Sequence, residues 1–552
     1  MKMPETVKSK LESTMNKFLW DGIPWCKWSK VCAPYDEGGL NMRSFQDIHT
    51  SFMVKAWFRM REGACLWIKF MLDKYCRVQH PSRAAVHPRH SRVWKNLVRG
   101  KDEAEKHLHW QLGHGGCDFW LDSWLNIGPL ADFYPNPRGG IKVNQVWHKG
   151  KWQNQYYRHV LTPEHVDMIE NTFFDPDMED KLLWKLSPDG AFSFKHTYED
   201  IREKRPVSPI YSTMWHQTIP RKISFLAWRL LQQWLPADDV MQSKGIKMAS
   251  RCNCCNHVET LKHVFFTNQV DVRIWAHFAR LCGITHPPFT EMTQVLTVWS
   301  LSVRVKGHIR QVLPFFILWG LWEGRNKAKH LKIPYTFHSI KARILYLLAA
   351  NARANMMAPK FWKGEFILAN LLRVTVRTPP AIKVKILSWD KPLAQTLKLN
   401  VDAAFNAGKS GYGGIIRDHN GDLYYAVGKY ATNDSPLEAE LDALLFCLQV
   451  CKTKGLYGIQ VEVDSSMVVK MTTHMMTHWR LHNKLSQVLS IFKSLGATIE
   501  HIYREKNLAA DWIAGNSMRK EQNFVWEAVT ADHAMQRLIQ LDKSRLPQLR
   551  IS

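Results

Sequence analysis

The feature that most constrains the fold is a change of pattern at Leu397, where strands and helices begin to alternate. Leu397, Leu399 and Val401 alternate with polar residues, which is typical of a strand with one buried face. After this strand the sequence predicts a glycine turn at 411–414 leading into 415–416, a strand at 423–427, a helix at 436–452, a strand at 459–463, a helix capped at 464–466, a strand at 497–503 and a helix at 507–515. This order predicts a mixed α/β sheet with flanking helices.

Four acidic residues occupy informative positions in this region. Asp402 lies near the end of the first strand, on the face opposite its apolar residues, and Asp464 ends the fourth strand. If these two strands are neighbours, both carboxylates meet at one edge of the sheet. Glu440 in the first helix and Asp511 in the last helix could then reach the same place.

Carboxylates gathered in this way repel one another unless cations lie between them. Oxygen ligands of this kind prefer Mg²⁺ or Mn²⁺, and a pair of such ions about 4 Å apart hydrolyses phosphodiesters. One acidic residue alone would indicate only a turn or a helix cap. The four in order predict a catalytic site with two divalent ions held by Asp402, Glu440, Asp464 and Asp511.

Five motifs in this region carry a resemblance to a known family. They are Leu397–Asp402 (LKLNVD), Gly411–Asp418 (GYGGIIRD), Ala439–Leu444 (AELDAL), Val461–Ser465 (VEVDS) and Arg504–Asp511 (REKNLAAD). In this order they resemble the plant ribonuclease H-like family, which is common at the C-terminus of non-LTR retrotransposon polyproteins and their domesticated fragments.

The resemblance implies a ribonuclease H-like fold, ligation of two Mg²⁺ or Mn²⁺ ions by the four carboxylates, and cleavage of the RNA strand of RNA/DNA hybrids. The family usually has Gly after the first Asp, where this chain has Ala403. The resemblance also implies that nucleic acid is contacted by Arg417, Ser465, Arg504 and Asn507.

Upstream segments resemble other parts of the same polyproteins. Phe18–Trp20 and Gly38–Arg43 resemble the region after a non-LTR reverse transcriptase, and Trp110–Trp124 resembles the Trp/Gly-rich part that follows it. Gly190–Phe194 and Pro220–Trp228 resemble the reverse transcriptase zinc-binding domain. The sequence has no Tyr-x-Asp-Asp motif, so we expect no polymerase activity from this chain and interpret it as a truncated remnant or a host gene derived from one.

The patterns together predict a division of the chain into consecutive segments. These are a helical tail at 1–105, a Trp/Gly-rich connecting module at 106–180, a reverse transcriptase zinc-binding-like domain at 181–285, a basic helical connector at 286–395, the ribonuclease H-like domain at 396–520 and a C-terminal tail at 521–552.

A small Cys/His cluster lies within the zinc-binding-like segment. Cys252 and Cys255 form a Cys-x₂-Cys pair and His263 follows, which makes these three residues candidate ligands of Zn²⁺. The resemblance implies a fourth ligand, a Cys, at a position where this chain has Asn268. The alternatives are that Cys254 or His257 supplies the fourth ligand, that water occupies the position, or that the module keeps its shape without the metal.

The net charge of +26 indicates a polyanionic partner, and nucleic acid is the main candidate. Residues 300–395 hold 17 Lys and Arg against 3 acidic residues, whereas residues 398–520 hold 14 against 12. The alternative is a set of solvated faces without a ligand. We expect Arg325, Lys327 and Lys329 in the basic stretch to contact phosphates, either of RNA/DNA hybrids or of single strands.

The eleven cysteines have no framework spacing and the N-terminus has no apolar signal region, so we expect an intracellular protein, nuclear or cytoplasmic and not secreted. The longest apolar run, Val312–Trp322, is shorter than the about 20 residues needed to span a bilayer, so we expect no membrane partner. The function predicted is a ribonuclease H-type endonuclease. The alternatives are a catalytically inactive nucleic-acid-binding remnant of a mobile element and a relic without a selected function.

Overall fold

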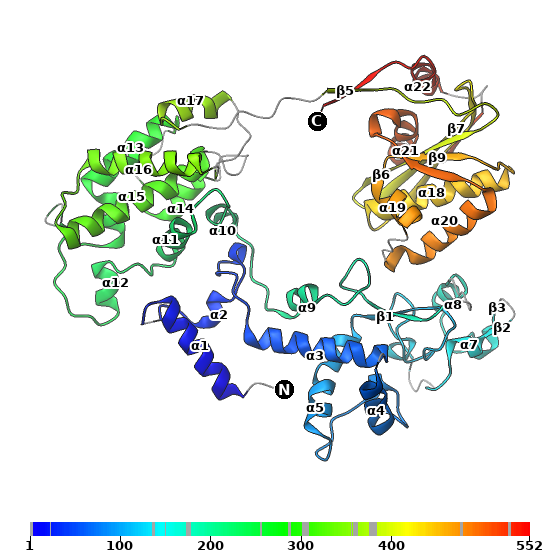
Figure 1. Cartoon of the computed structure of the whole chain (residues 1–552), viewed down its shortest axis with the longest axis horizontal. Helices are drawn as coiled ribbons and strands as arrows, with labels where there is room; N and C mark the ends of the chain where they lie inside the picture. Colours follow the sequence, from blue (N-terminus) through cyan, green and yellow to red (C-terminus); the bar gives the residue numbers. More distant parts are fainter. Residues whose placement is uncertain are drawn as a thin grey trace. The chain divides into compact units, whose positions relative to one another are not determined.

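The computed structural model describes residues 4–551, apart from residues 23, 64, 135–138, 149–150, 173–177, 254, 256, 285–288, 301–308, 355, 357–362, 375–383, 475–478 and 528–531 (Figure 1). The chain divides into two compact units. The first comprises residues 49–201 and 382–552, and the second comprises residues 2–48 and 202–381. This division places parts of the predicted 1–105 segment in different units.

A six-stranded sheet forms the centre of the C-terminal region, with the strand order β10-β9-β6-β7-β8-β11. Strands β6, β9 and β10 are parallel neighbours, and β7, β8 and β11 continue the sheet in antiparallel pairs. The strands are β6 (Lys398–Asn406), β7 (Lys409–Arg417), β8 (Leu423–Thr432), β9 (Gln460–Val463), β10 (Thr498–His501) and β11 (Phe524–Trp526). The mixed α/β sheet predicted from the sequence is therefore confirmed, and its first and fourth strands are neighbours.

Helices cover both faces of this sheet (Figure 1). Helix α18 (Pro436–Thr453) packs on one face, where α19 (Ser466–His474) and α20 (His482–Leu495) join it in a large apolar core. Helix α21 (Leu508–Lys520) packs on the other face, where α22 (His533–Lys543) lies against it. The sheet is therefore the middle layer of three.

The glycine run 411–414, which predicts a turn, lies inside strand β7. A Cβ atom on Gly413 would lie 2.4 Å from the carbonyl oxygen of Ala510 in α21. A Cβ atom on Gly414 would lie 2.4 Å from the Sγ atom of Cys447 in α18. The turn prediction is wrong because these glycines serve the close approach of a helix to each face of the strand.

Residues 521–552 also fold onto this region, although the sequence predicts a tail. Strand β11 pairs with β8, and Met535 and Ile539 of α22 are buried against α21. Strand β12 (Gln548–Ile551) pairs with β5 (Val384–Leu387), which precedes the sheet in the chain. The folded region therefore extends beyond residue 520 on its C-terminal side and begins before residue 396.

The polar face of β6 is buried, whereas the alternating pattern predicts that it faces solvent. Lys398 and Asn400 are almost fully buried because both bond to the carboxylate of Glu462 on β9, at 2.7 and 2.8 Å. The indole Nε1 atom of Trp389 donates to the same carboxylate at 3.0 Å. A buried charge of this kind is tolerated only when it is paired and hydrogen-bonded, as Glu462 is here.

Arg417 belongs to this buried layer. Its side chain has no solvent exposure, and its Nη1 atom lies 2.5 Å from a carboxylate oxygen of Asp542 in α22. Its guanidinium group also lies over the ring of Trp389, 3.5 Å from the centroid. The prediction that Arg417 contacts nucleic acid is therefore wrong, because the side chain joins α22 to the sheet.

The remainder of the first unit, residues 49–201, combines short helices with two small antiparallel strand pairs. Its cores are rich in buried tryptophan, including Trp57, Trp94 and Trp184. The elements are α3 (Phe45–Glu62, which begins in the second unit), α4 (Leu66–Tyr75), α5 (Arg92–Arg99), α6 (Lys101–Glu105), β1 (Leu108–Gln111), α7 (Val143–Val146), β2 (Trp147–His148), β3 (Lys151–Trp152), α8 (Pro163–Glu170), β4 (Lys181–Trp184) and α9 (Phe194–Ile201).

The second unit is helical in the residues that the structure describes. It has one large apolar core to which helices from α1 to α17 contribute. No helix among the described residues is long and apolar enough to cross a bilayer. The helices are α1 (Glu5–Leu19), α2 (Trp28–Val31), α10 (Pro209–Met214), α11 (Arg221–Leu231), α12 (Asp238–Ser243), α13 (Gln269–Leu281), α14 (Met292–Val295), α15 (Ile309–Leu331), α16 (Phe337–Arg353) and α17 (Lys363–Leu371).

Candidate active site and metal centres

Two neighbouring parallel strands bring the first pair of predicted carboxylates together. Val401 of β6 is in register with Val463 of β9, and the next residue on each strand is Asp402 and Asp464, respectively. Because the two strands run in the same direction, both side chains lie at the level where β9 ends; β6 itself continues to Asn406, so Asp402 lies in the middle of its strand rather than near its end. The pairing still brings the two carboxylates together, as the sequence predicts.

Helix α18 delivers Glu440 to the same place. The helix begins at Pro436, and the Oγ atom of its N-cap residue Ser435 accepts a hydrogen bond from the backbone N–H of Glu438 at 3.3 Å. Carboxylate oxygens of Asp402, Glu440 and Asp464 all lie within 4.8 Å of one another. Three of the four predicted ligands are thus gathered into one group.

Asp511, the fourth predicted ligand, lies in the first turn of α21 and is paired with a cation. The Nη2 atom of Arg504 lies 2.7 Å from its carboxylate, and Arg504 itself is exposed. The hydrogen bond with Asp511 is the main cause that raises the pKa of Arg504, and the charges of Asp402 and Asp464 raise it further. Arg504 therefore lies within the electrostatic reach of the whole carboxylate group.

The pKa values of the three gathered carboxyl groups are all raised, so their ionised forms are disfavoured. Burial, followed by the charges of Asp464, Glu440 and Asp511, raises the pKa of Asp402 to about 9. Burial and the charge of Asp464 raise the pKa of Glu440 to about 8, and burial also raises the pKa of Asp464. Without cations the group would hold protons at neutral pH. Its chemistry, with carboxylate oxygens alone, fits hard divalent ions such as Mg²⁺ or Mn²⁺.

The backbone around Asp402 tolerates the departure from the family pattern. Ala403 lies inside β6, paired with Tyr412, and it is not among the residues with a positive φ. Its N–H donates to the Oδ1 atom of Asp402 at 2.9 Å. An alanine therefore fits this position without backbone strain.

Asn507 and Ser465 have structural partners next to the carboxylate group. Asn507 is buried, and its Nδ2 atom donates to the carbonyl oxygen of Val401 at 2.9 Å, which ties the start of α21 to the end of β6. The prediction that Asn507 contacts nucleic acid is therefore wrong. Ser465 is partly exposed and its Oγ atom faces the backbone N–H of Val468 at 3.5 Å, so its contact with nucleic acid stays a prediction, as does that of the exposed Arg504.

His501 is a site residue that the sequence reasoning missed. It ends β10, the third parallel strand, and its Nε2 atom lies 3.1 Å from the carbonyl oxygen of Asp464. The side chain is exposed. Its position at the carboxyl end of a strand next to β9 is the signal that could have identified it.

The second unit gathers the three predicted zinc ligands. Ligand atoms of Cys252, Cys255 and His263 all lie within 4.8 Å of one another, and Cys255 Sγ lies 3.2 Å from His263 Nε2. Cys254 lies outside the described residues. His257 is exposed and is not part of this group, although its ring centroid lies 5.7 Å from that of His263. In this arrangement it lies beside the three predicted ligands rather than among them.

Two of the basic residues predicted to contact phosphates are committed to ion pairs. Arg325 is buried and grips the carboxylate of Glu259 with two nitrogens, of which Nε lies 3.1 Å from Oε2. Lys329 pairs with Asp238 and, at 3.1 Å, with Glu259. Burial contradicts the phosphate prediction for Arg325, whereas the partly exposed Lys329 keeps its prediction open. Lys327 is about half exposed beside its partner on the same helix, so its prediction stays open.

The layered sheet with its carboxylate group defines the C-terminal region as ribonuclease H-like. Comparison with family models agrees, because a reverse transcriptase-like model matches residues 400–517. A second model, for zinc binding in reverse transcriptase, matches residues 192–275. The chain therefore combines the ribonuclease H-like region and the reverse transcriptase zinc-binding region that its resemblance to plant non-LTR retrotransposon proteins predicts.

Similar proteins include a curated Arabidopsis thaliana protein named "Putative ribonuclease H protein", which is 22% identical over 564 residues, a match that covers 95% of this chain and 86% of the relative. Among solved structures, ribonuclease H1 of the archaeon Halobacterium salinarum NRC-1 is 21% identical, covering 23% of this chain and 99% of that one, with a TM-score of 0.21. The ribonuclease H1 called LC11, solved with an RNA/DNA hybrid, is 20% identical, covering 23% of this chain and 99% of that one, with a TM-score of 0.22.

Proposed function

We propose that this chain is a divalent-metal-dependent ribonuclease H that hydrolyses the RNA strand of RNA/DNA hybrids. The observation that carries the proposal is the meeting of Asp402, Glu440 and Asp464, with carboxylate oxygens within 4.8 Å of one another. They come from two strands and a helix that are separate in the sequence. A fold needs no such group of mutually repelling carboxylates, so their gathering favours a cation-dependent function.

The residues around the group have separate roles in this proposal. Asp402, Glu440 and Asp464 would hold the cations, and Asp511 would join them once released from Arg504. Two bound divalent ions would activate the attacking water and stabilise the leaving oxygen of the scissile phosphate. Asn507 positions the group by fixing α21 to the end of β6, since its amide bonds to the carbonyl of Val401.

Part of the affinity for the nucleic acid would come from basic residues outside the ribonuclease H-like region. Residues 398–520 carry a small excess of positive charge, 14 basic against 12 acidic residues, whereas residues 300–395 carry 17 against 3. Phosphate contacts supply affinity without sequence readout. We therefore propose that the basic stretch 300–395 adds to the affinity for the polyanion, with the exposed Arg504 and the partly exposed Lys327 as candidate contacts.

The test is cleavage of a labelled RNA/DNA hybrid by the full chain in Mg²⁺, compared with double-stranded RNA and DNA of the same sequence. Asp464→Asn removes one carboxylate of the group, and Asp434→Asn removes an exposed carboxylate of the same region as the matched control. We expect metal-dependent cleavage of the hybrid by the wild type and the control, and none by Asp464→Asn. Equal behaviour of all three proteins would refute the proposal.

The rival function, nucleic-acid binding without catalysis, is distinguished in the same samples. A salt-dependent affinity for the hybrid that is not accompanied by cleavage in Mg²⁺ or Mn²⁺ would favour the rival. Cleavage that is lost with Asp464→Asn, while binding is kept, would favour the nuclease.

A further inference from the structure

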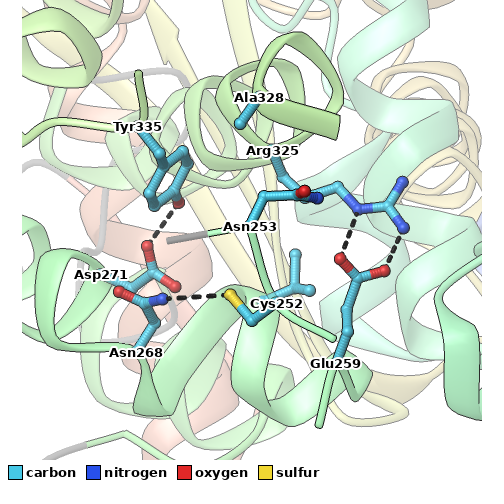
Figure 2. A pocket seen from close by; sticks show the side chains of 9 residues that line it. Cys252, Asn253, Glu259, Asn268, Asp271, Arg325, Ala328 and Tyr335 are labelled. Atoms are coloured by element: carbon cyan, nitrogen blue, oxygen red, sulfur yellow. Dashed lines mark hydrogen bonds and ion pairs between the residues drawn. The ribbon is translucent and has the colours of Figure 1, made fainter. Parts of the chain in front are cut away.

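The Cys252–Cys255–His263 group has Asn268 beside it, where a fourth metal ligand would be needed. Asn268 is buried, and its Nδ2 atom lies 3.7 Å from the Sγ atom of Cys252 (Figure 2). Its Oδ1 atom accepts the backbone N–H of Val270 at 2.8 Å, which makes Asn268 the N-cap of α13. Because the cap holds the oxygen toward the helix, the amide NH₂ group must face the thiol.

An amide NH₂ group donates hydrogen bonds and offers no lone pair to a metal. Turning the amide over would place its oxygen near Cys252, but it would break the hydrogen bond that caps α13. Structural zinc sites take four ligands, drawn from thiolates, imidazoles and carboxylates. Asn268 as placed does not fit that requirement.

A buried carboxylate, Asp271, lies near this group but outside it, and burial raises its pKa well above the usual value, which favours its neutral form. Asp271 lines the same small cavity, of about 20 Å³, together with Cys252 and Asn268 (Figure 2). Its Oδ1 atom accepts the hydroxyl of Tyr335 at 2.5 Å. Among the residues that the structure describes, only Cys252, Cys255 and His263 form the metal-ligand group here, and Asp271 is not part of it.

Ion pairs, rather than a metal ion, connect the cysteine loop to the neighbouring helices. Glu259 lies between Cys255 and His263 in the sequence and is only 1% exposed. Both of its carboxylate oxygens bond to Arg325 of α15, and Lys329 of the same helix joins them (Figure 2 shows the Arg325 pair). Lys329 also pairs with Asp238 of α12, so the loop, α12 and α15 are connected by one buried ion-pair network, which we call the Glu259 clasp.

We propose that this chain does not hold structural zinc at Cys252, Cys255 and His263, and that the Glu259 clasp fastens the cysteine loop in place of the metal. The proposal concerns the second unit alone and does not depend on the nuclease activity. A metal-dependent module of this kind would lose its fold on chelation, because the binding free energy of structural zinc is also folding free energy. The Glu259 clasp would make the fold indifferent to chelation.

The first test is metal content. The full chain is purified with zinc present, dialysed against metal-free buffer without a chelator, and analysed for zinc by mass spectrometry. We expect none to be retained by the wild type and about one zinc per chain by Asn268→Cys, which completes a tetrahedral Cys₃His set. Asn268→Ser is the matched control, because it keeps an N-cap hydroxyl without adding a good zinc ligand.

Either of two results would overturn the proposal. The first is one retained zinc in the wild type that disappears in Cys255→Ser, since the three ligands would then suffice. The second is one retained zinc that disappears in Cys254→Ser, since Cys254 would then be the fourth ligand. Failure of Asn268→Cys to bind more zinc than Asn268→Ser would also contradict the proposal, because position 268 would not then be the place of the missing fourth ligand.

The second test is thermal unfolding with and without a chelator that binds Zn²⁺ tightly and Mg²⁺ weakly. We expect no change of Tm for the wild type and a fall of Tm for zinc-loaded Asn268→Cys. Glu259→Gln is expected to lower Tm far more than Glu323→Gln, because Glu259 is 1% exposed whereas the side chain of Glu323 is 21% exposed in its ion pairs. A wild type destabilised by the chelator, or a neutral Glu259→Gln, would refute the role of the Glu259 clasp.

Discussion

Replacing Asp402 with Asn is expected to stabilise the metal-free protein, by an amount that grows with pH. Asp402 is 4% exposed and stands among three other carboxylates, and its pKa is raised from 3.8 to about 9 by burial and by their charges. Between these two values the folded chain keeps a proton that the unfolded chain has already lost. The free energy of unfolding therefore falls as the pH rises through this window.

The magnitude follows from the width of that window. Each pH unit above 3.8 costs the folded state about 1.4 kcal/mol until the pH approaches 9. At pH 7 the penalty from Asp402 amounts to about 4 kcal/mol. Asn has nearly the same shape and no ionisable proton, so Asp402→Asn removes the penalty and the stability difference between the two proteins should vanish near pH 4.

The assay is calorimetric unfolding of the full chain and of Asp402→Asn, in a chelator, from pH 5 to pH 8. We expect the variant to unfold at the higher temperature, with a difference that widens steadily across this range. Saturating Mg²⁺ should then raise the Tm of the wild type more than that of the variant, because bound cations relieve the same repulsion. A difference in Tm that does not change with pH would refute the reasoning. A variant less stable than the wild type at every pH would show that Asp402 stabilises the metal-free fold.

Three further predictions test the packing and the buried charges. Gly413→Ala should lower the free energy of unfolding by about 1–3 kcal/mol in denaturant titrations, because its Cβ atom would lie 2.4 Å from the carbonyl oxygen of Ala510; unchanged stability would show that α21 can move aside. Arg417→Met should cost about 3–5 kcal/mol, because it leaves the partly buried Asp542 unpaired, and adding Asp542→Leu should recover most of that loss in the same titrations. Burial, followed by the charge of Lys185, lowers the pKa of His109 from 6.5 to about 3, so His109 by itself destabilises the fold by about 1.4 kcal/mol per pH unit as the pH falls below 6.5, and the stability of His109→Phe relative to the wild type should rise by that amount per pH unit in acid unfolding.

The carboxylate site was predictable because its signals are local. The alternation of residues 397–402 predicts the first strand, and the acidic residues Asp402 and Asp464 that follow short apolar stretches can be recognised without knowing the sheet. Only the pairing of β6 with β9 was an assumption, and the sheet order confirms it. The departure at Asn268 was also visible in the sequence, because the family resemblance implies a Cys at that position.

The errors all concern residues whose partners are distant in the sequence. Arg417 meets Asp542 across 125 positions, and Arg325 meets Glu259 across 66. An arginine that is buried by such a partner has the same local pattern as one that faces a phosphate. The sequence therefore indicates basic residues but not which of them remain free.

By itself the sequence determined the order of strands and helices and the set of carboxylates, because both depend on residue type and short-range periodicity, and through its family resemblance it marked Asn268 as a departure. The tertiary structure alone decided that Gly411–Gly414 lies in a strand with a helix packed closely on each face. It also decided that residues beyond 520 add a strand to the sheet and that Arg417 and Arg325 are buried. The physical reason is that burial depends on which surfaces meet. That is decided by long-range packing of whole elements against one another rather than by any local pattern.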